Sequence, residues 1–453
     1  MAGIPSGRDS FGSKFGVIAA TAGSAIGLGN IWRFPYVAGE NGGAAFLIIY
    51  IGFILVIGIP VMLSEFTIGR KAQLNAFGAF RKLAPGKSWY LVGLMGVVAA
   101  FMILSFYTAV AGWTLEYLFQ SFVNGFEGKS AQDLNGMFHG FIGSPWRPLL
   151  WYFVFMVLTG VIIMAGVQKG IEKSTKILMP MLLILLIILV IRSVTLPDSK
   201  EGILFLFRPD FSKISTSAVL EALGQAFFSL SIGMGTLITY ASYIQKRDNL
   251  GVTAISVAFA DTFIAILAGL AIFPAVFAFN IAPGSGEGLV YITLPNIFQQ
   301  MPGGYYFAIM FFILLAVAAL TSTISVLEVI VAFFVEELKL KRKAATLLAA
   351  FSVSILGVMS VLSTSTMADV KIFSFTVFDL MNFASANILL PLGGLFIVIF
   401  VAWYLGREKT EEELSNEGSL KIKYIPLLMF IIKYLAPLAI AFIFLQGLGI
   451  FRF

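Results

Sequence analysis

Long apolar segments recur along the whole chain and are separated by short polar stretches. A helix that crosses a bilayer needs about 20 mainly apolar residues, and eleven segments reach that length. They are expected at residues 14–37, 43–68, 89–123, 146–165, 170–193, 218–243, 252–279, 305–336, 344–363, 372–404 and 423–449. The pattern predicts an all-α integral membrane protein with eleven spans, in which residues 1–453 form one domain.

The first apolar segment is interrupted near its centre by small and polar residues. Gly23, Gly27, Gly29 and Asn30 cluster there, and Arg33 follows. Gly23 and Gly27 alone fit a helix-packing face of the GxxxG type. Such a face needs neither the amide of Asn30 nor the guanidinium of Arg33, so the full pattern favours a break in the helix.

The sixth segment has the same character five segments later, with Ser229, Ser231, Gly233 and Gly235 at its middle. Paired interruptions predict an inverted repeat of five helices, with halves at residues 1–193 and 218–404 and an extra span at 423–449. Helices broken at the bilayer midplane present N–H groups to a carboxylate and carbonyl groups to a cation. The pair therefore predicts the binding site of a secondary transporter.

Composition excludes a soluble protein and several kinds of chemistry. Hydrophobic residues make up 59% of the chain and charged residues 12%, and the mean hydropathy is +0.94. Cysteine is absent and His139 is the single histidine, which excludes disulfides, thiolate chemistry and multi-histidine metal sites. With no HExxH motif either, an intramembrane enzyme is not expected.

Most of the 30 lysines and arginines fall in alternate loops that include residues 70–87, 169–176 and 339–343. This bias predicts a cytoplasmic N-terminus and an extracellular C-terminus in a multi-pass plasma membrane protein, expected in a bacterial inner membrane. The net charge of +6 comes from these loops, so no nucleic-acid partner is expected. No obligate protein partner is evident. The acidic stretch from Glu411 to Glu417 is expected to be a solvated loop face.

Polar groups deep within the later spans are candidate cation ligands. Asp261 lies about nine residues into its span, roughly 13 Å deep, where a short side chain cannot reach water. It fits either a sodium ligand or a hydrogen-bonded structural carboxylate. Thr321 and Ser322 form a hydroxyl pair that could serve a hard cation, although each could equally bond back to its own helix. Glu65 and Glu328 are expected network or gate residues.

Three motifs carry a resemblance to a known family. The segments NIWRFPYVAGENGGAAF, FSLSIGMGTLITYASY and LTSTISVLEV resemble the neurotransmitter:sodium symporters, particularly their bacterial amino-acid branch, and the resemblance covers essentially the whole chain. It implies sodium-coupled import of amino acids by alternating access, with two Na⁺ ions bound.

The resemblance also implies site residues. The first sodium site would use Ala25, Asn30, Ser229, Asp261 and the substrate carboxylate, and the second Gly23, Ile26, Ala318, Thr321 and Ser322. Substrate would contact Ala25, Gly27, Gly29, Ile103, Tyr107, Phe228, Ser229, Ser231, Met234, Ser322 and Val326. An outer gate would comprise Arg33, Phe228 and Asn382, and an inner gate Arg8, Tyr243 and Glu336. Gly170 and Pro180 fit either the unwinding of span five or an ordinary helix start and kink.

Three positions refine this expectation. Gly27 stands where monoamine carriers have an aspartate, which favours a substrate that brings its own carboxylate. Asn382 replaces an acidic partner of the gate arginine, so a direct ion pair with Arg33 is not expected. Asp261 stands where chloride-dependent animal relatives have asparagine, and we hypothesise that its charge replaces chloride.

The adaptable side chain of Met234 suggests broad hydrophobic and aromatic selectivity. The alternative within carriers is a symporter of another carboxylated solute, such as a betaine-like osmolyte. A channel would differ by conducting without saturation.

Overall fold

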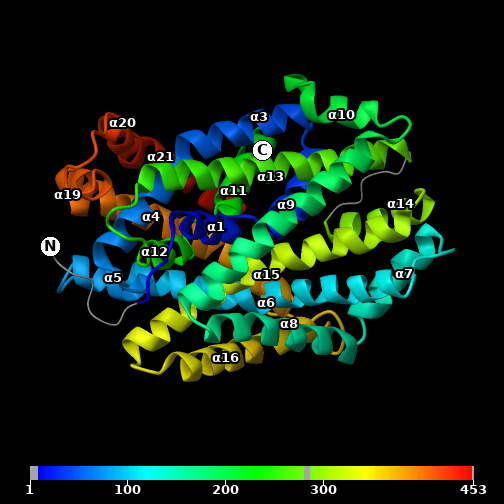
Figure 1. The fold of residues 1–453 in the computed structure, drawn as a ribbon, viewed down its shortest axis with the longest axis horizontal. Helices are drawn as coiled ribbons and strands as arrows, with labels where there is room; N and C mark the ends of the chain where they lie inside the picture. The colour runs from blue at the N-terminus through cyan, green and yellow to red at the C-terminus, as the bar shows by residue number, and fades with distance from the viewer. Residues whose placement is uncertain (1–8, 280–285, 451–453) are drawn as a thin grey trace.

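The computed structural model describes residues 9–279 and 286–450, and Figure 1 shows their arrangement. Within these ranges, nine helices are long and apolar enough to span a membrane. A tenth span consists of two helical pieces, Lys14–Ala25 and Gly29–Glu40, bent by 52°. The eleventh is the predicted sixth span, whose two helices are separated by a non-helical stretch. All eleven predicted segments are therefore helical, as expected.

The spans contain both α-helices and π-helical turns, the latter labelled η. They are α1 (Lys14–Ala25), η1 (Gly29–Arg33) and α2 (Phe34–Glu40); α3 (Ala44–Phe53), η2 (Ile54–Gly58) and α4 (Ile59–Ala72); α6 (Tyr90–Phe122); α8 (Trp146–Met164); η3 (Val167–Glu172) and α9 (Lys173–Val194); α11 (Thr216–Ser229) and α12 (Thr236–Ala241); α13 (Leu250–Ala278); α15 (Gly304–Glu337); α16 (Arg342–Leu362); α17 (Val377–Phe383), η6 (Ala384–Leu389), α18 (Leu390–Ile399) and η7 (Phe400–Leu405); and α20 (Ile425–Phe430), η8 (Ile431–Leu435) and α21 (Ala436–Gly447).

Shorter helices, which the apolar pattern did not predict, connect the spans. They are α5 (Ala76–Leu83), α7 (Ala131–Ile142), α10 (Lys200–Phe207), the 3₁₀ turn η4 (Phe211–Lys213), η5 (Leu289–Thr293), α14 (Leu294–Gln300) and α19 (Gly406–Leu414). In Figure 1, α5, α12 and α19 gather at one end of the molecule and α7, α10 and α14 at the other. We call the first of these the basic end, because Arg70, Lys71, Arg81, Lys82, Lys87 and Lys246 belong to the segments there.

Central and peripheral helices differ in how much of their surface is buried within the protein. In α6 and α15, two-thirds of the most apolar stretch is buried within the protein. Peripheral helices such as α8 and α16 instead expose large apolar side chains, including Val157, Val161 and Phe351. In a membrane these side chains face lipid, and the central pair forms the scaffold against which the interrupted helices pack.

The acidic stretch at Glu411–Glu417 is only partly the solvated face that the sequence predicted. Glu413 is 2% exposed and forms ion pairs with Arg70 at 2.6 Å and Lys246 at 2.5 Å. Arg70 is fully buried and also donates to the backbone carbonyls of Glu413 and Asp248. The prediction was wrong for Glu413, because folding of the stretch into α19 turns this residue toward the end of α4.

Adjacent basic residues permit a matched test of this cluster. We expect Arg70→Gln to lower thermal stability strongly, because breaking a buried ion pair costs about 3–5 kcal/mol. Lys71→Gln should change little, since its pair with Glu412 is exposed and such pairs contribute about 0–1 kcal/mol. The measurement is the unfolding temperature of the detergent-solubilised variants. Equal shifts of the unfolding temperature in the two variants would contradict a stabilising role for the buried ion pairs of Glu413.

Candidate functional site

The first span is broken at the predicted position. Helix α1 ends at Ala25, and Ile26 adopts an extended conformation with φ −77° and ψ 102°. Helical structure resumes at Gly29. At the break, the N–H groups of Gly27 and Leu28 donate to the side chains of Asn30 and Tyr107 and not to helix carbonyls.

The sixth span is broken between Leu230 and Gly235, where Ser231, Gly233 and Gly235 all have positive φ angles. Glycine is required at Gly233, because a side-chain carbon there would lie 2.3 Å from the carbonyl oxygen of Leu390. The Gly233 N–H donates to Glu65 Oε1 at 2.8 Å. Glu65 thus has the network role predicted for it.

The two breaks are joined directly and through a buried polar cluster. Ser231 Oγ donates to the carbonyl of Ser24 at 2.9 Å. Asn30 Nδ2 donates to Asp261 Oδ1 at 2.7 Å and to Ser229 Oγ at 3.1 Å. Ser229 Oγ in turn donates to Asp261 Oδ1 at 2.7 Å. The structure therefore brings together the three side chains predicted for the first sodium site.

Tyr50 completes this cluster and was not predicted from the sequence. Its hydroxyl donates to Asp261 Oδ2 at 3.0 Å, and Tyr50 is fully buried. Both carboxylate oxygens of Asp261 therefore accept hydrogen bonds within the buried interior. A tyrosine in an apolar segment gives no signal of such a role in the hydropathy pattern.

A second group of oxygen atoms lies beside α15. Thr321 Oγ1 is 3.0 Å from the carbonyl oxygen of Ala318 and 3.4 Å from that of Ile26. Gly23 packs against it, since a side-chain carbon there would lie 3.4 Å from Thr321 Cβ. These oxygens come from α15 and from the break in the first span. Ser322, predicted for the same site, lies beside Gly27 and Tyr107.

A small enclosed cavity of about 30 Å³ lies between the breaks. Its lining includes every predicted substrate-contact residue and adds Ser24: the lining residues are Ser24, Ala25, Gly27, Gly29, Ile103, Tyr107, Phe228, Ser229, Ser231, Met234, Ser322 and Val326. Tyr107 Oη accepts a hydrogen bond from the Leu28 N–H at 3.1 Å. Because one water needs about 10–15 Å³, an amino acid would enter only if these side chains moved apart.

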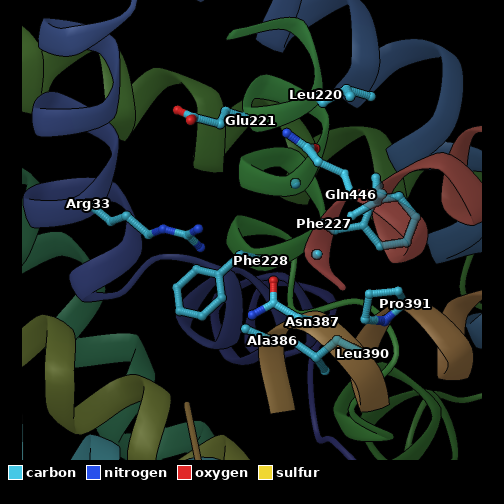
Figure 2. Close-up of a pocket in the computed structure, with 13 residues that line it drawn as sticks. Arg33, Leu220, Glu221, Phe227, Phe228, Ala386, Asn387, Leu390, Pro391 and Gln446 are labelled. Carbon is cyan, nitrogen blue, oxygen red and sulfur yellow. The ribbon is translucent and has the colours of Figure 1, made fainter. Parts of the chain in front are cut away.

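A larger cavity of about 300 Å³, which Phe228 also lines, is shown in Figure 2. The Arg33 guanidinium extends into it and lies over the Phe228 ring, 4.7 Å from its centre. Asn387 lines this cavity together with Arg33, and the predicted gate residue Asn382 does not belong to its lining. Within the described part of the chain, the Arg33 guanidinium makes no hydrogen bond or ion pair.

At the basic end, contacts between side chains close the site. The sequence predicted only some of the residues that make them. Arg8 lies outside the described residues. Tyr243 donates to Glu328 Oε1 at 2.7 Å, and Arg342 donates to both oxygens of Glu328. Glu336 accepts bonds from the backbone and side-chain nitrogens of Asn75. Arg342 was missed because it sits in a run of basic loop residues.

The N-terminal segment covers this end of the site. The Phe11 N–H donates to the carbonyl of Tyr243 at 3.1 Å, and the Gly12 N–H donates to Glu172 at 2.7 Å. Span five is helical from Val167 to Val194, with Gly170 in its first turns and Pro180 within α9. In this conformation, Gly170 and Pro180 therefore mark a helix start and an internal proline.

Comparisons with known proteins agree with this architecture. The sequence profile described as the sodium:neurotransmitter symporter family matches residues 8–133 and 141–452. A sodium-dependent transporter of Bacillus subtilis is 39% identical over 441 residues, covering 97% of this chain and 98% of the relative. The serotonin transporter of Drosophila melanogaster is 28% identical, covering 73% of this chain and 60% of the relative.

Among solved structures, that of MhsT in complex with L-phenylalanine is 48% identical and has a TM-score of 0.89. The match covers 97% of this chain and all of MhsT. The shared fold, interrupted spans and sodium-dependent relatives lead to one conclusion: this chain belongs to the sodium:neurotransmitter symporter family and is a sodium-dependent membrane transporter.

Proposed function

We propose that this protein imports neutral hydrophobic or aromatic L-amino acids together with two sodium ions, by alternating access and without chloride. The observation that carries the proposal is the position of the cavity. It lies directly between two broken helices, beside a buried carboxylate, and its other walls are apolar. Ile103, Phe228, Met234 and Val326 supply these walls, which suit an apolar side chain, and MhsT was solved with L-phenylalanine.

The first sodium ion would be held by the side chains of Asn30, Ser229 and Asp261, by the Ala25 carbonyl and by the substrate carboxylate. Supporting this assignment, the three side chains already lie within hydrogen-bond distance of one another. All their ligand atoms are oxygens, as a hard cation prefers. Because the substrate would complete the coordination, sodium and amino acid would bind cooperatively.

The second sodium ion would be held by Thr321, Ser322 and the carbonyls of Gly23, Ile26 and Ala318. Thr321 Oγ1 lies near two of these carbonyls, which supports the assignment. Ser322 would rotate from its present position beside Gly27 to complete the site. An ion here would tie α15 to the first span.

Chloride independence would follow from Asp261. Its carboxylate accepts bonds from Asn30, Ser229 and Tyr50 and provides a fixed negative charge beside the proposed sodium ion. In a low-dielectric interior such a charge offsets that of the cation. A mobile anion would therefore be superfluous.

The proposed transport cycle uses two gates. Arg33, Phe228 and Asn382 would close the outer side. Tyr243 and Glu336, with Arg8, would close the inner side, and the Glu328–Arg342 pair would belong to the same gate. We further propose that the N-terminus is cytoplasmic and the C-terminus extracellular, and that residues 1–193 and 218–404 form the inverted repeats, followed by 423–449.

Competition uptake into proteoliposomes tests the substrate class. A sodium gradient would drive uptake of labelled leucine against an excess of unlabelled tryptophan, phenylalanine, lysine, glutamate or betaine. We expect strong competition by tryptophan and phenylalanine only. Strong competition by lysine or glutamate would refute the substrate class, and competition by betaine alone would favour the osmolyte alternative.

Gly27 provides a test of the cavity itself. A side-chain carbon at Gly27 would lie 2.3 Å from Ser322 Oγ and 3.0 Å from the Tyr107 hydroxyl. We expect Gly27→Ala to raise the KM for amino acid about fivefold or more, since overpacking costs about 1–3 kcal/mol. Gly52→Ala in α3 is the control, because a carbon there has open space. An unchanged KM for Gly27→Ala would place the substrate elsewhere.

A further inference from the structure

A hollow of about 460 Å³ lies at the basic end, between the start of α6 and the side of α18. Its lining residues are Lys87, Ser88, Trp89, Leu91, Val92, Met95 and Phe396. Leu91 is 51% exposed and Phe396 38% exposed. Because the protein spans a membrane, large apolar side chains exposed on the flank of its helices lie against lipid. The hollow is thus open to acyl chains.

The polar end of the hollow carries a basic group without a partner. The Lys87 ammonium group forms no hydrogen bond or ion pair within the described ranges. The four other basic residues of α4, α5 and their connections are all engaged: Arg70 with Glu413, Lys71 with Glu412, Arg81 with Glu337, and Lys82 with the Ala72 carbonyl. The positive charge of Lys87 is therefore available to an external anion.

The local structure adds to this positive field. Helix α6 is 33 residues long, and Trp89 at its N-cap provides no side-chain acceptor for the first N–H groups. The positive end of the helix dipole therefore lies beside Lys87 and Ser88. Trp89 packs against Phe400 and Tyr404, with ring centres 5.1 Å and 6.1 Å apart. Such aromatic groups are typical of headgroup depth.

We propose that this hollow binds one anionic phospholipid. Its phosphate would contact Lys87 and Ser88, and one acyl chain would lie along Leu91, Met95 and Phe396. A lipid with net negative charge fits better than a zwitterionic one, because the hollow's lining contains a cation and no carboxylate. The bound lipid would bridge α6, which carries Ile103 and Tyr107, and α18, which begins where Leu390 packs on Gly233.

Native mass spectrometry of the purified transporter, titrated with phosphatidylglycerol or with phosphatidylcholine of the same acyl chains, tests this proposal. We expect the wild-type protein to retain one phosphatidylglycerol more tightly than phosphatidylcholine. Lys87→Ala should weaken phosphatidylglycerol binding about fivefold. Met95→Trp, which fills the hollow and keeps the charge, should weaken both lipids.

The matched control is Lys343→Ala, which removes an exposed lysine at the start of α16 that does not line the hollow. It should leave phosphatidylglycerol binding unchanged. Equal effects of Lys87→Ala and Lys343→Ala would overturn the proposal in favour of diffuse charge attraction. Equal affinity of the wild-type protein for the two lipids would overturn the preference for an anionic headgroup. Unchanged binding of both lipids by Met95→Trp would show that the lipid does not bind in this hollow.

Discussion

Asp261→Ala is expected to raise strongly the sodium concentration that amino-acid uptake requires. The residue is fully buried, and its carboxylate is bonded to Asn30, Ser229 and Tyr50. Losing one charged partner of a buried site costs about 2–5 kcal/mol, or more than about 30-fold in sodium affinity. The measurement is the sodium concentration that gives half-maximal uptake in proteoliposomes. Asp261→Asn keeps the volume of the side chain and should lose uptake or acquire a dependence on chloride.

The neighbouring Thr262 supplies the control for this variant. Its hydroxyl bonds back to the Ala258 carbonyl of the same helix, and Thr262→Val should leave the sodium dependence unchanged. Gel filtration of both variants separates loss of function from loss of folding. If folded Asp261→Ala protein transported with the sodium dependence of the wild type, the first proposed sodium site would be wrong.

Thr321→Val is expected to give the second large effect. The substitution keeps the shape of the side chain and removes the hydroxyl that lies near the carbonyls of Ala318 and Ile26. Leaving a buried polar site incomplete costs about 1–3 kcal/mol, so we expect half-maximal uptake to need about tenfold more sodium. Uptake measured over a range of sodium concentrations gives this value directly.

Thr323 lies two residues further along the same helix and faces away from the break. Its hydroxyl lies 2.9 Å from that of Thr159. Thr323→Val therefore also removes a buried threonine hydroxyl, but one that is not a proposed sodium ligand. We expect its sodium dependence to match that of the wild type. A comparable loss in both valine variants would assign the effect to helix packing instead of ion binding.

Hydropathy alone was enough to predict the spans, because a bilayer requires about 20 apolar residues in each crossing helix. The same criterion misses short connecting helices such as α5, α7 and α14, which lie outside that length range. The partners of charged residues in loops were equally hard to predict from the sequence. Glu413 and Arg342 sit in highly charged sequence, and only the folded chain shows that each has a buried or gate-side partner.

The site was predictable where polar or glycine residues interrupt apolar segments, since such residues are costly in a membrane unless they bind something. Tyr50 does not interrupt the pattern in this way and was missed, and Ser24 lies within the first interruption but was not singled out.

The central proposal is that Asp261 provides the fixed negative charge that makes sodium sufficient for coupling. Uptake of labelled leucine into proteoliposomes should be compared in three external solutions: sodium chloride, sodium gluconate and choline chloride. We expect equal uptake in the two sodium solutions and background uptake in choline chloride. A collapse of uptake in sodium gluconate would contradict it.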